Sequence, residues 1–196
     1  MDRVMEPAIR DADRIASSTE SESARLVERA RRGDAIAFEA LLRSRLDGLF
    51  RTAWAILGDE ADARDATQDA CLTAWRSLPR LRDPARFDAW LLRVLVNGCR
   101  MRLRSRARIR EIPMTPDLDR AGPSTDDPAT GCDADTVARA FDRISADART
   151  ILVLHHLQHQ PVATIAAVLG VPTGTVKSRL FTARTALAQA LEREGR

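Results

Sequence analysis

The apolar residues of this chain recur at steps of three and four positions in nearly every segment that shows a pattern. Apolar side chains at that spacing form one stripe along an α-helix, whereas a half-buried strand alternates at every second residue. Aromatic residues make up only 4% of the 196 residues, and β-sheet folds draw heavily on aromatic and β-branched side chains. The sequence therefore predicts an all-α protein.

Aspartate residues mark where the first helices begin. Asp34, Asp59 and Asp83 each precede a helical pattern, and an aspartate in that place accepts hydrogen bonds from unpaired backbone N–H groups. The pattern after Asp34 continues as far as Gly58, which predicts one long amphipathic helix. Together these segments predict the first of two helical units.

The second unit has the pattern of a helix-turn-helix. Pro161 begins a short apolar helix, Gly170 breaks it, and a longer basic helix follows from Thr173. A short helix, a turn containing glycine and a longer helix are the elements of that motif. A unit of roughly 60 residues has a small core. We expect it to contain Leu154, Ile165, Leu169, Val176 and Leu180.

Net charge divides the chain into three segments. Residues 1–110 carry a net charge of +5, residues 111–135 carry −6 and residues 136–196 carry +4. The acidic middle segment contains four prolines and no apolar periodicity, which is typical of a flexible linker. We therefore expect a flexible N-terminal extension and two small helical domains joined by an acidic linker, with the boundaries 1–22, 23–110, 111–135 and 136–196.

Several classes of protein are disfavoured by what the sequence lacks. There is no apolar run near the roughly 18 residues of a membrane span and no apolar signal-peptide stretch at the start, so we expect a cytoplasmic protein without direct membrane insertion. Cys71, Cys99 and Cys132 have neither disulfide-framework nor zinc-site spacing. His155 and His159 lie four positions apart, without the glutamate of a zinc-protease helix. We expect no metal, no cofactor and no catalytic residue.

Arginine occupies every second position from Arg100 to Arg110. On a helix, Arg93, Arg100 and Arg104 lie close to one face, where they form an electrostatic surface able to follow a phosphate backbone. A solvated helix end is the alternative, because cations are favourable near the C-terminal end of the helix dipole.

The last helix has a polar face with no acidic residue before Glu192. Its hydroxyls and free backbone N–H groups suit phosphate contacts, and its longer side chains can reach base edges in a major groove. An ordinary polar helix face is the alternative. The residues of this face are Thr173, Thr175, Lys177, Ser178, Arg179, Thr182 and Arg184.

A third surface is acidic. Asp62, Asp65 and Asp69 recur at steps of three and four with Gln68 beside them, so they share one stripe of their helix. Most acidic stripes of this kind are simply the solvent-exposed face of a helix. Beside a basic DNA-binding face, an acidic stripe also suits docking on a basic protein partner.

Three segments resemble a known family. Residues 62–78 read DARDATQDACLTAWRSL and residues 87–108 read FDAWLLRVLVNGCRMRLRSRAR, and both resemble region 2 of bacterial RNA polymerase sigma factors. Residues 144–187, which contain GTVKSRLFTAR, resemble region 4. Because no region 3 lies between them, the chain resembles the extracytoplasmic-function group, group IV, of the sigma-70 family.

The resemblance implies a transcription initiation factor that directs core RNA polymerase to promoter DNA and is not itself an enzyme. It implies that the acidic stripe docks on the clamp helices of the largest polymerase subunit. The last helix would read the minus-thirty-five element as duplex. An anti-sigma factor is a further candidate partner. Thr182 stands where relatives often carry arginine, so the promoter sequence does not transfer.

The resemblance also implies that the loop before the arginine-rich helix, and that helix itself, recognise and melt the minus-ten element. We assign Trp90, which lies on the same helix, to the core. By position the minus-ten role falls to Arg82, Asp83, Phe87, Arg93, Asn97, Arg100 and Arg104.

Two other functions stay open at this point. A stand-alone helix-turn-helix regulator would bind duplex DNA without polymerase, but it gives no reason for the block from Asp62 to Arg110. An enzyme built around His155 and His159 would hold a metal ion in stoichiometric amount.

Overall fold

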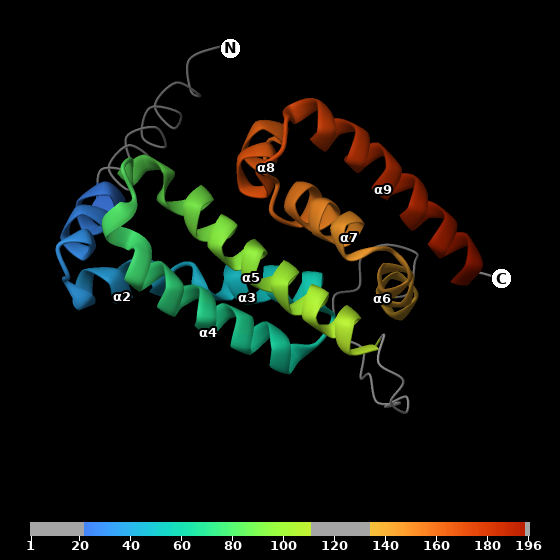
Figure 1. Cartoon of the computed structure of the whole chain (residues 1–196), viewed down its shortest axis with the longest axis horizontal. Helices are drawn as coiled ribbons and strands as arrows, with labels where there is room; N and C mark the ends of the chain where they lie inside the picture. Colours follow the sequence, from blue (N-terminus) through green and yellow to red (C-terminus); the bar gives the residue numbers. More distant parts are fainter. Residues whose placement is uncertain (1–21, 111–133, 195–196) are drawn as a thin grey trace, which may run out of the picture.

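The computed structural model describes residues 22–110 and 134–194, and these residues form helices and no strand. Figure 1 shows two groups of helices packed side by side. We call residues 22–110 the first unit and residues 134–194 the second unit. The expected N-terminal extension and acidic linker lie almost entirely outside the described residues. An all-α fold with two helical domains is confirmed for the part of the chain that is described.

Short turns connect the helices of the first unit. Residues 22–31 are helical and precede α2. The elements that follow are α2 (Ala35–Arg43), α3 (Leu46–Leu57), α4 (Glu60–Ser77), the 3₁₀ turns η1 (Leu78–Arg80) and η2 (Pro84–Arg86), and α5 (Phe87–Arg110). The three aspartate caps are confirmed: the side chains of Asp34, Asp59 and Asp83 accept hydrogen bonds from backbone N–H groups at 3.0, 2.8 and 3.0 Å.

The long helix expected between Asp34 and Gly58 is wrong, because the chain breaks at Ser44 and Arg45 into α2 and α3. The backbone N–H of Arg45 donates to the carbonyl of Leu42 at 2.8 Å and closes a tight turn. The guanidinium of Arg45 also bonds the carbonyl of Leu41 at 2.8 Å and the carboxylate of Asp88 at 2.5 Å. The apolar spacing continues through the break, so periodicity alone could not reveal it.

The second unit contains the expected helix-turn-helix. Its elements are α6 (Ala134–Arg143), α7 (Ala146–Leu152), the π-helix η3 (Val153–Leu157), α8 (Val162–Leu169) and α9 (Thr173–Glu194). Gly170 joins α8 to α9 with a left-handed φ of 68°, a conformation that glycine adopts at no steric cost.

The expected core of the second unit is confirmed at four positions and wrong at one. Leu154, Ile165, Val176 and Leu180 are buried. Leu169 is only partly buried, and Val168 is buried instead, 2% exposed. Helix α8 packs against α5 as well as against α9 and η3, which accounts for the burial of Val168, while Leu169 packs against the edge of the core.

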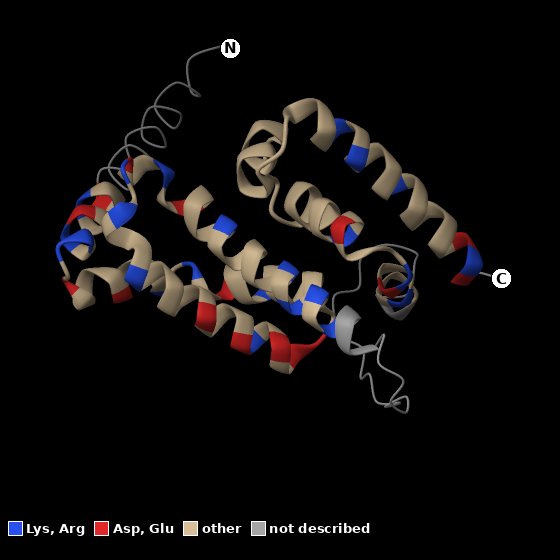
Figure 2. Cartoon of the chain, in the orientation of Figure 1, with Lys and Arg blue, Asp and Glu red and all other residues tan. Residues whose placement is uncertain are grey.

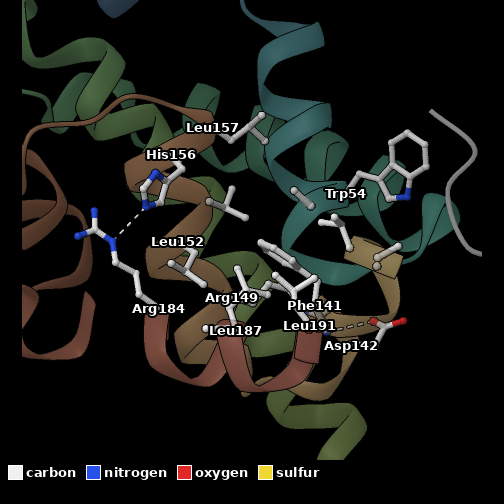
Figure 3. A pocket seen from close by; sticks show the side chains of 16 residues that line it. Trp54, Phe141, Asp142, Arg149, Leu152, His156, Leu157, Arg184, Leu187 and Leu191 are labelled. Atoms are coloured by element: carbon white, nitrogen blue, oxygen red, sulfur yellow. Dashed lines mark hydrogen bonds and ion pairs between the residues drawn. The ribbon is translucent and has the colours of Figure 1, made fainter. Parts of the chain in front are cut away.

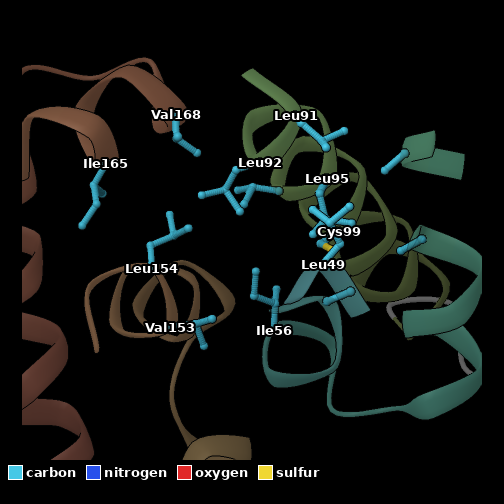
Figure 4. Packing of buried hydrophobic residues seen from close by; sticks show 14 of the residues in the cluster. Leu49, Ile56, Leu91, Leu92, Leu95, Cys99, Val153, Leu154, Ile165 and Val168 are labelled. Atoms are coloured by element: carbon cyan, nitrogen blue, oxygen red, sulfur yellow. The ribbon is translucent and has the colours of Figure 1, made fainter. Parts of the chain in front are cut away.

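The two units share one continuous apolar core, which we call the seam. Figure 4 shows Leu92 of α5 and Val168 of α8 directed toward each other across it. The sequence predicted two domains joined by a linker and gave no sign of a contact between them. The buried residues that meet at the seam are Leu49, Ile56, Leu91, Leu92, Leu95, Val153, Leu154, Ile165 and Val168.

Two arginines add polar contacts across the seam. Arg149 of α7 is buried and donates to the carbonyl of Ile56 in α3 at 3.4 Å, as well as to Asp142 at 3.0 Å. A cation is favourable at the C-terminal end of α3, where carbonyls lack helical partners. Arg100 of α5 pairs with Asp147 of α7 at 3.1 Å.

Candidate nucleic-acid and partner interfaces

The acidic stripe lies along the outer side of α4, beside the basic helix α5 (Figure 2). Its centre is open to solvent, because Gln68 is exposed and the side chains of Asp65 and Asp69 are 66% and 65% exposed. Asp62 is 22% exposed. The predicted stripe thus consists of three accessible residues and one that is mostly covered.

Two arginines of α5 pair with this stripe. Arg102 approaches Asp69 at 2.5 Å, Asp65 at 3.8 Å and Asp62 at 4.0 Å. Arg106 pairs with Asp62 and lies 3.9 Å from Asp59. The alternating arginines therefore do not form one surface. Successive helical residues are rotated by about 100°, so positions two apart point in nearly opposite directions, which is why the sequence placed Arg93, Arg100 and Arg104 together on one face.

The opposite side of α5 carries the cations that remain accessible. Arg93, Asn97 and Arg104 are exposed, and Arg100 is partly covered where it pairs across the seam. Met101, 68% exposed, lies on this side as well and was not expected there. The side chains of α5 are described as far as Arg106, so the arginines beyond it are not placed.

The loop before α5 has both exposed and buried members. Arg82 and Asp83 are exposed. Phe87 is 2% exposed, so it belongs to the core in this structure, and its expected DNA contact stays a prediction. Its ring lies 5.4 Å from the guanidinium of Arg45 and anchors the start of α5 against the turn between α2 and α3. Trp90 is partly buried against the core, with its ring 5.9 Å from that of Phe87, in agreement with its assignment.

The polar face of α9 is open to solvent along its length. Six of the seven expected residues are exposed and Thr175 is half-buried, while Val176, Leu180 and Ala183 hold the opposite side in the core. Phe181 is 74% exposed on the polar side, one turn after Lys177. A phenyl ring in that place can contact a thymine methyl group. Sequence reasoning missed this residue, although its step of four from Lys177 placed it on the polar face.

Histidine and cysteine residues form no metal site among the described residues. The ring centroids of His155 and His156 are 4.6 Å apart. Partial burial, together with the nearby charges of His155, Arg184 and His159, lowers the pKa of His156. Burial raises the pKa of Cys99 to about 12. Cys132 lies outside the described residues. None of the helices between residues 22 and 110 or 134 and 194 is long and apolar enough to cross a membrane.

Sequence comparisons place both units in one family. Residues 41–109 match the family model of Sigma-70 region 2, and residues 134–187 match that of Sigma-70, region 4. The ECF RNA polymerase sigma factor SigM of Mycobacterium tuberculosis is 38% identical over 81% of this chain and 79% of its own length. The RNA polymerase sigma-H factor of Pseudomonas aeruginosa is 30% identical over 89% of this chain and 96% of its own.

Two solved structures have the same arrangement of helices. One is the sigma factor RpoE in complex with the anti-sigma factor NepR from Bartonella quintana, with a TM-score of 0.64 and 26% identity over 79% of this chain and 96% of that one. The other is CnrH in complex with the cytosolic domain of CnrY, with a TM-score of 0.63 and 25% identity over 88% of this chain and 98% of that one.

The match to region 2 disfavours a stand-alone helix-turn-helix regulator, because it accounts for the block from Asp62 to Arg110 that such a regulator leaves unexplained. The relatives are sigma factors rather than enzymes. The chain therefore belongs to the extracytoplasmic-function (ECF) group of the sigma-70 family, the RNA polymerase sigma factors that direct transcription initiation.

Proposed function

We propose that this sigma factor uses three separate surfaces: the acidic stripe of α4 for polymerase, the exposed side of α5 for the minus-ten element and the polar face of α9 for the minus-thirty-five element. The observation that carries this proposal is the division of charge between adjacent helices, acidic on α4 and basic on α5 (Figure 2). The reaction chemistry belongs to the polymerase.

Polymerase docking falls to Asp65, Gln68 and Asp69, the exposed members of the stripe. Each carboxylate has two oxygens and can accept several hydrogen bonds, so Asp65 and Asp69 can bind a basic partner while Arg102 stays paired with them. Asp62 has a supporting role, because it holds Arg106 and Arg102. An electrostatic match of this kind governs mainly the rate and specificity of association.

Minus-ten recognition falls to Arg82 and Asp83 of the loop and to Arg93, Asn97 and Arg104 of α5. A melted strand needs cations along its phosphates and apolar surface beside its bases. Met101 supplies exposed apolar surface on the same side. Arg100 joins this surface only after it leaves Asp147.

Minus-thirty-five recognition falls to the α9 face, in the manner of a recognition helix in a major groove. Thr173 and Thr175 lie at its N-terminal end, where phosphate contacts are favourable. Lys177, Ser178 and Arg179 are exposed and can reach base edges, as can Thr182 and Arg184 farther along. Phe181 adds an apolar contact.

The seam opens when both promoter elements are bound. Helix α8 contacts both α5 and α9, and packed helices have axes roughly 8–10 Å apart, so the two DNA-binding helices are about 20 Å apart at this point. Elements centred near positions −10 and −35 are about 25 base pairs apart, or about 85 Å of duplex. A closed seam cannot span that distance.

An anti-sigma factor is the further partner that we propose. Both solved relatives were captured with proteins of that kind or with a partner's cytosolic domain.

Runoff transcription with purified core polymerase and a genomic promoter library tests the whole proposal. The wild-type chain should produce discrete start sites that core polymerase alone does not use. A chain that binds polymerase and selects no start site would contradict it.

A further inference from the structure

A groove of about 760 Å³ lies where α3 of the first unit meets α6, α7, η3 and α9 of the second (Figure 3). It shares Arg184 with the proposed α9 surface, and its other lining residues lie outside the three surfaces. Its volume lies within the roughly 300–1,000 Å³ of small-molecule sites, which are mostly apolar with a few polar groups. Its apolar walls include Trp54, Phe141, Leu152, Leu157, Leu187 and Leu191.

One end of the groove is positively charged. Arg184 of α9 donates from Nε to Nε2 of His156 at 3.3 Å, so that imidazole nitrogen carries no proton. Among the described residues, no carboxylate lies within ion-pair distance of Arg184. At the other end, Arg149 is already paired with Asp142 at 3.0 Å. Figure 3 shows the apolar side chains between these two ends.

The backbone at the charged end is unusual. Val153–Leu157 form a π-helix, a conformation that is rare and frequently found at functional sites. This element carries Val153, His156 and Leu157 to the groove. Leu157 is 47% exposed there, so the groove has an open apolar edge next to its unmatched cation.

We propose that this groove binds a medium-chain fatty acid, with the carboxylate on Arg184 and the hydrocarbon chain along Leu187 and Leu191 toward Trp54. The charge of Arg184 selects an anion, and the apolar walls select an alkyl chain. Because the walls come from both units, the ligand binds while the seam is closed and stabilises that state.

Calorimetric titration of the full chain with decanoate below its micelle-forming concentration tests the site, with 1-decanol as the uncharged control. Decanoate should bind one molecule per chain and raise the unfolding temperature. Arg184→Gln should weaken decanoate binding about tenfold, the loss expected for one charge-assisted hydrogen bond, and should leave 1-decanol binding unchanged. Arg179→Gln, an exposed arginine on the same helix outside the groove, is the matched control and should bind decanoate normally.

Trp54→Ala removes the wall that comes from the first unit. This variant should weaken decanoate and 1-decanol alike, with circular dichroism checking that the helices remain.

Absence of saturable decanoate binding would overturn the proposal, as would an equal effect of Arg184→Gln on both compounds. A chain that sediments as a dimer and excludes decanoate would show that a second copy covers the groove instead. Decanoate binding that appears only after Ile112, Met114 and Leu118 are replaced by serine would assign the groove to residues 111–133. Neither polymerase nor promoter DNA enters these measurements, so their outcome is independent of the proposed function.

Discussion

Helices α5 and α9 are both long and basic, but they use their cations differently. Helix α5 packs against α3, α4, α7 and α8, from both units, whereas the main neighbours of α9 are α6, α7 and α8 of its own unit. As a result Arg102 of α5 faces the acidic stripe and Arg100 faces Asp147. Lys177 and Arg179 of α9 are exposed and have no ion pair among the described residues. The number of neighbours around a basic helix therefore decides how many of its charges are available to DNA.

The largest effect is expected for the acidic stripe of α4, which pairs with α5, when its charge is reversed. Asp65→Arg with Asp69→Arg should weaken association with core polymerase by about a hundredfold or more, because truncation of buried charge pairs at interfaces costs 2–5 kcal/mol or more and reversal adds repulsion. A pull-down with purified core enzyme measures it.

The control for this pair reverses two exposed carboxylates elsewhere. Glu39→Arg with Glu60→Arg changes net charge by the same amount and removes exposed ion pairs of the same kind. Equal loss of polymerase binding in both variants would mean that net charge, rather than the stripe, is responsible.

A second experiment separates the two sets of arginines on α5. Arg93→Ala with Arg104→Ala should weaken binding of an unpaired promoter strand and flatten its salt dependence by about 1.4, at about 0.7 for each lost phosphate contact on single strands. Arg102→Ala with Arg106→Ala should leave that slope unchanged and lower stability by about 0–1 kcal/mol for each exposed pair. The same slope change in both variants would contradict the division of α5 into two sides.

The open face of α9 predicts a smaller, sequence-dependent effect. Lys177→Ala and Phe181→Ala should each weaken binding to an upstream promoter duplex, with about 1–3 kcal/mol at stake for a good base contact. Arg193→Ala, near the far end of the helix, is the control. Fluorescence anisotropy with duplexes that differ at one position measures the change. Full-strength binding by both variants would exclude this face.

The smallest effect concerns His156, which accepts a hydrogen bond from Arg184 of α9. Because the pKa of His156 is lowered in the folded chain, the unfolded chain binds more protons near that pKa, and stability should fall as pH decreases below about 6.5. His156→Gln should make the unfolding temperature less dependent on pH between 7 and 5. An unchanged dependence would show that other groups are responsible.

Local signals predicted much of this fold. Some features involve only residues within one helical turn of each other, so the local sequence is enough to predict them. These are the aspartate caps at Asp34, Asp59 and Asp83 and the glycine turn at Gly170. The break at Arg45 cannot be predicted in this way, because the guanidinium of Arg45 bonds to Asp88, 43 positions away. The seam is invisible for the same reason: Leu92 and Val168 look like ordinary core residues of separate units.

The candidate surfaces were predictable where helical spacing alone decides exposure. The α9 face and the exposed stripe residues Asp65 and Asp69 follow from that rule. Phe87 and Arg100 do not, because their contact partners Arg45 and Asp147 come from the turn between α2 and α3 and from α7. Met101 and Phe181 were missed because an apolar residue in a helix is ordinarily assigned to a core.

The buried guanidinium of Arg149 favours the proposed opening of the seam. An interface of hydrocarbon alone regains nothing from water when it separates, whereas this cation is rehydrated on release and keeps Asp142 as its neighbour within the second unit. Hydration thus offsets part of the work of separation. Arg149 therefore contributes contacts to the closed arrangement and also limits the free energy by which that arrangement is favoured.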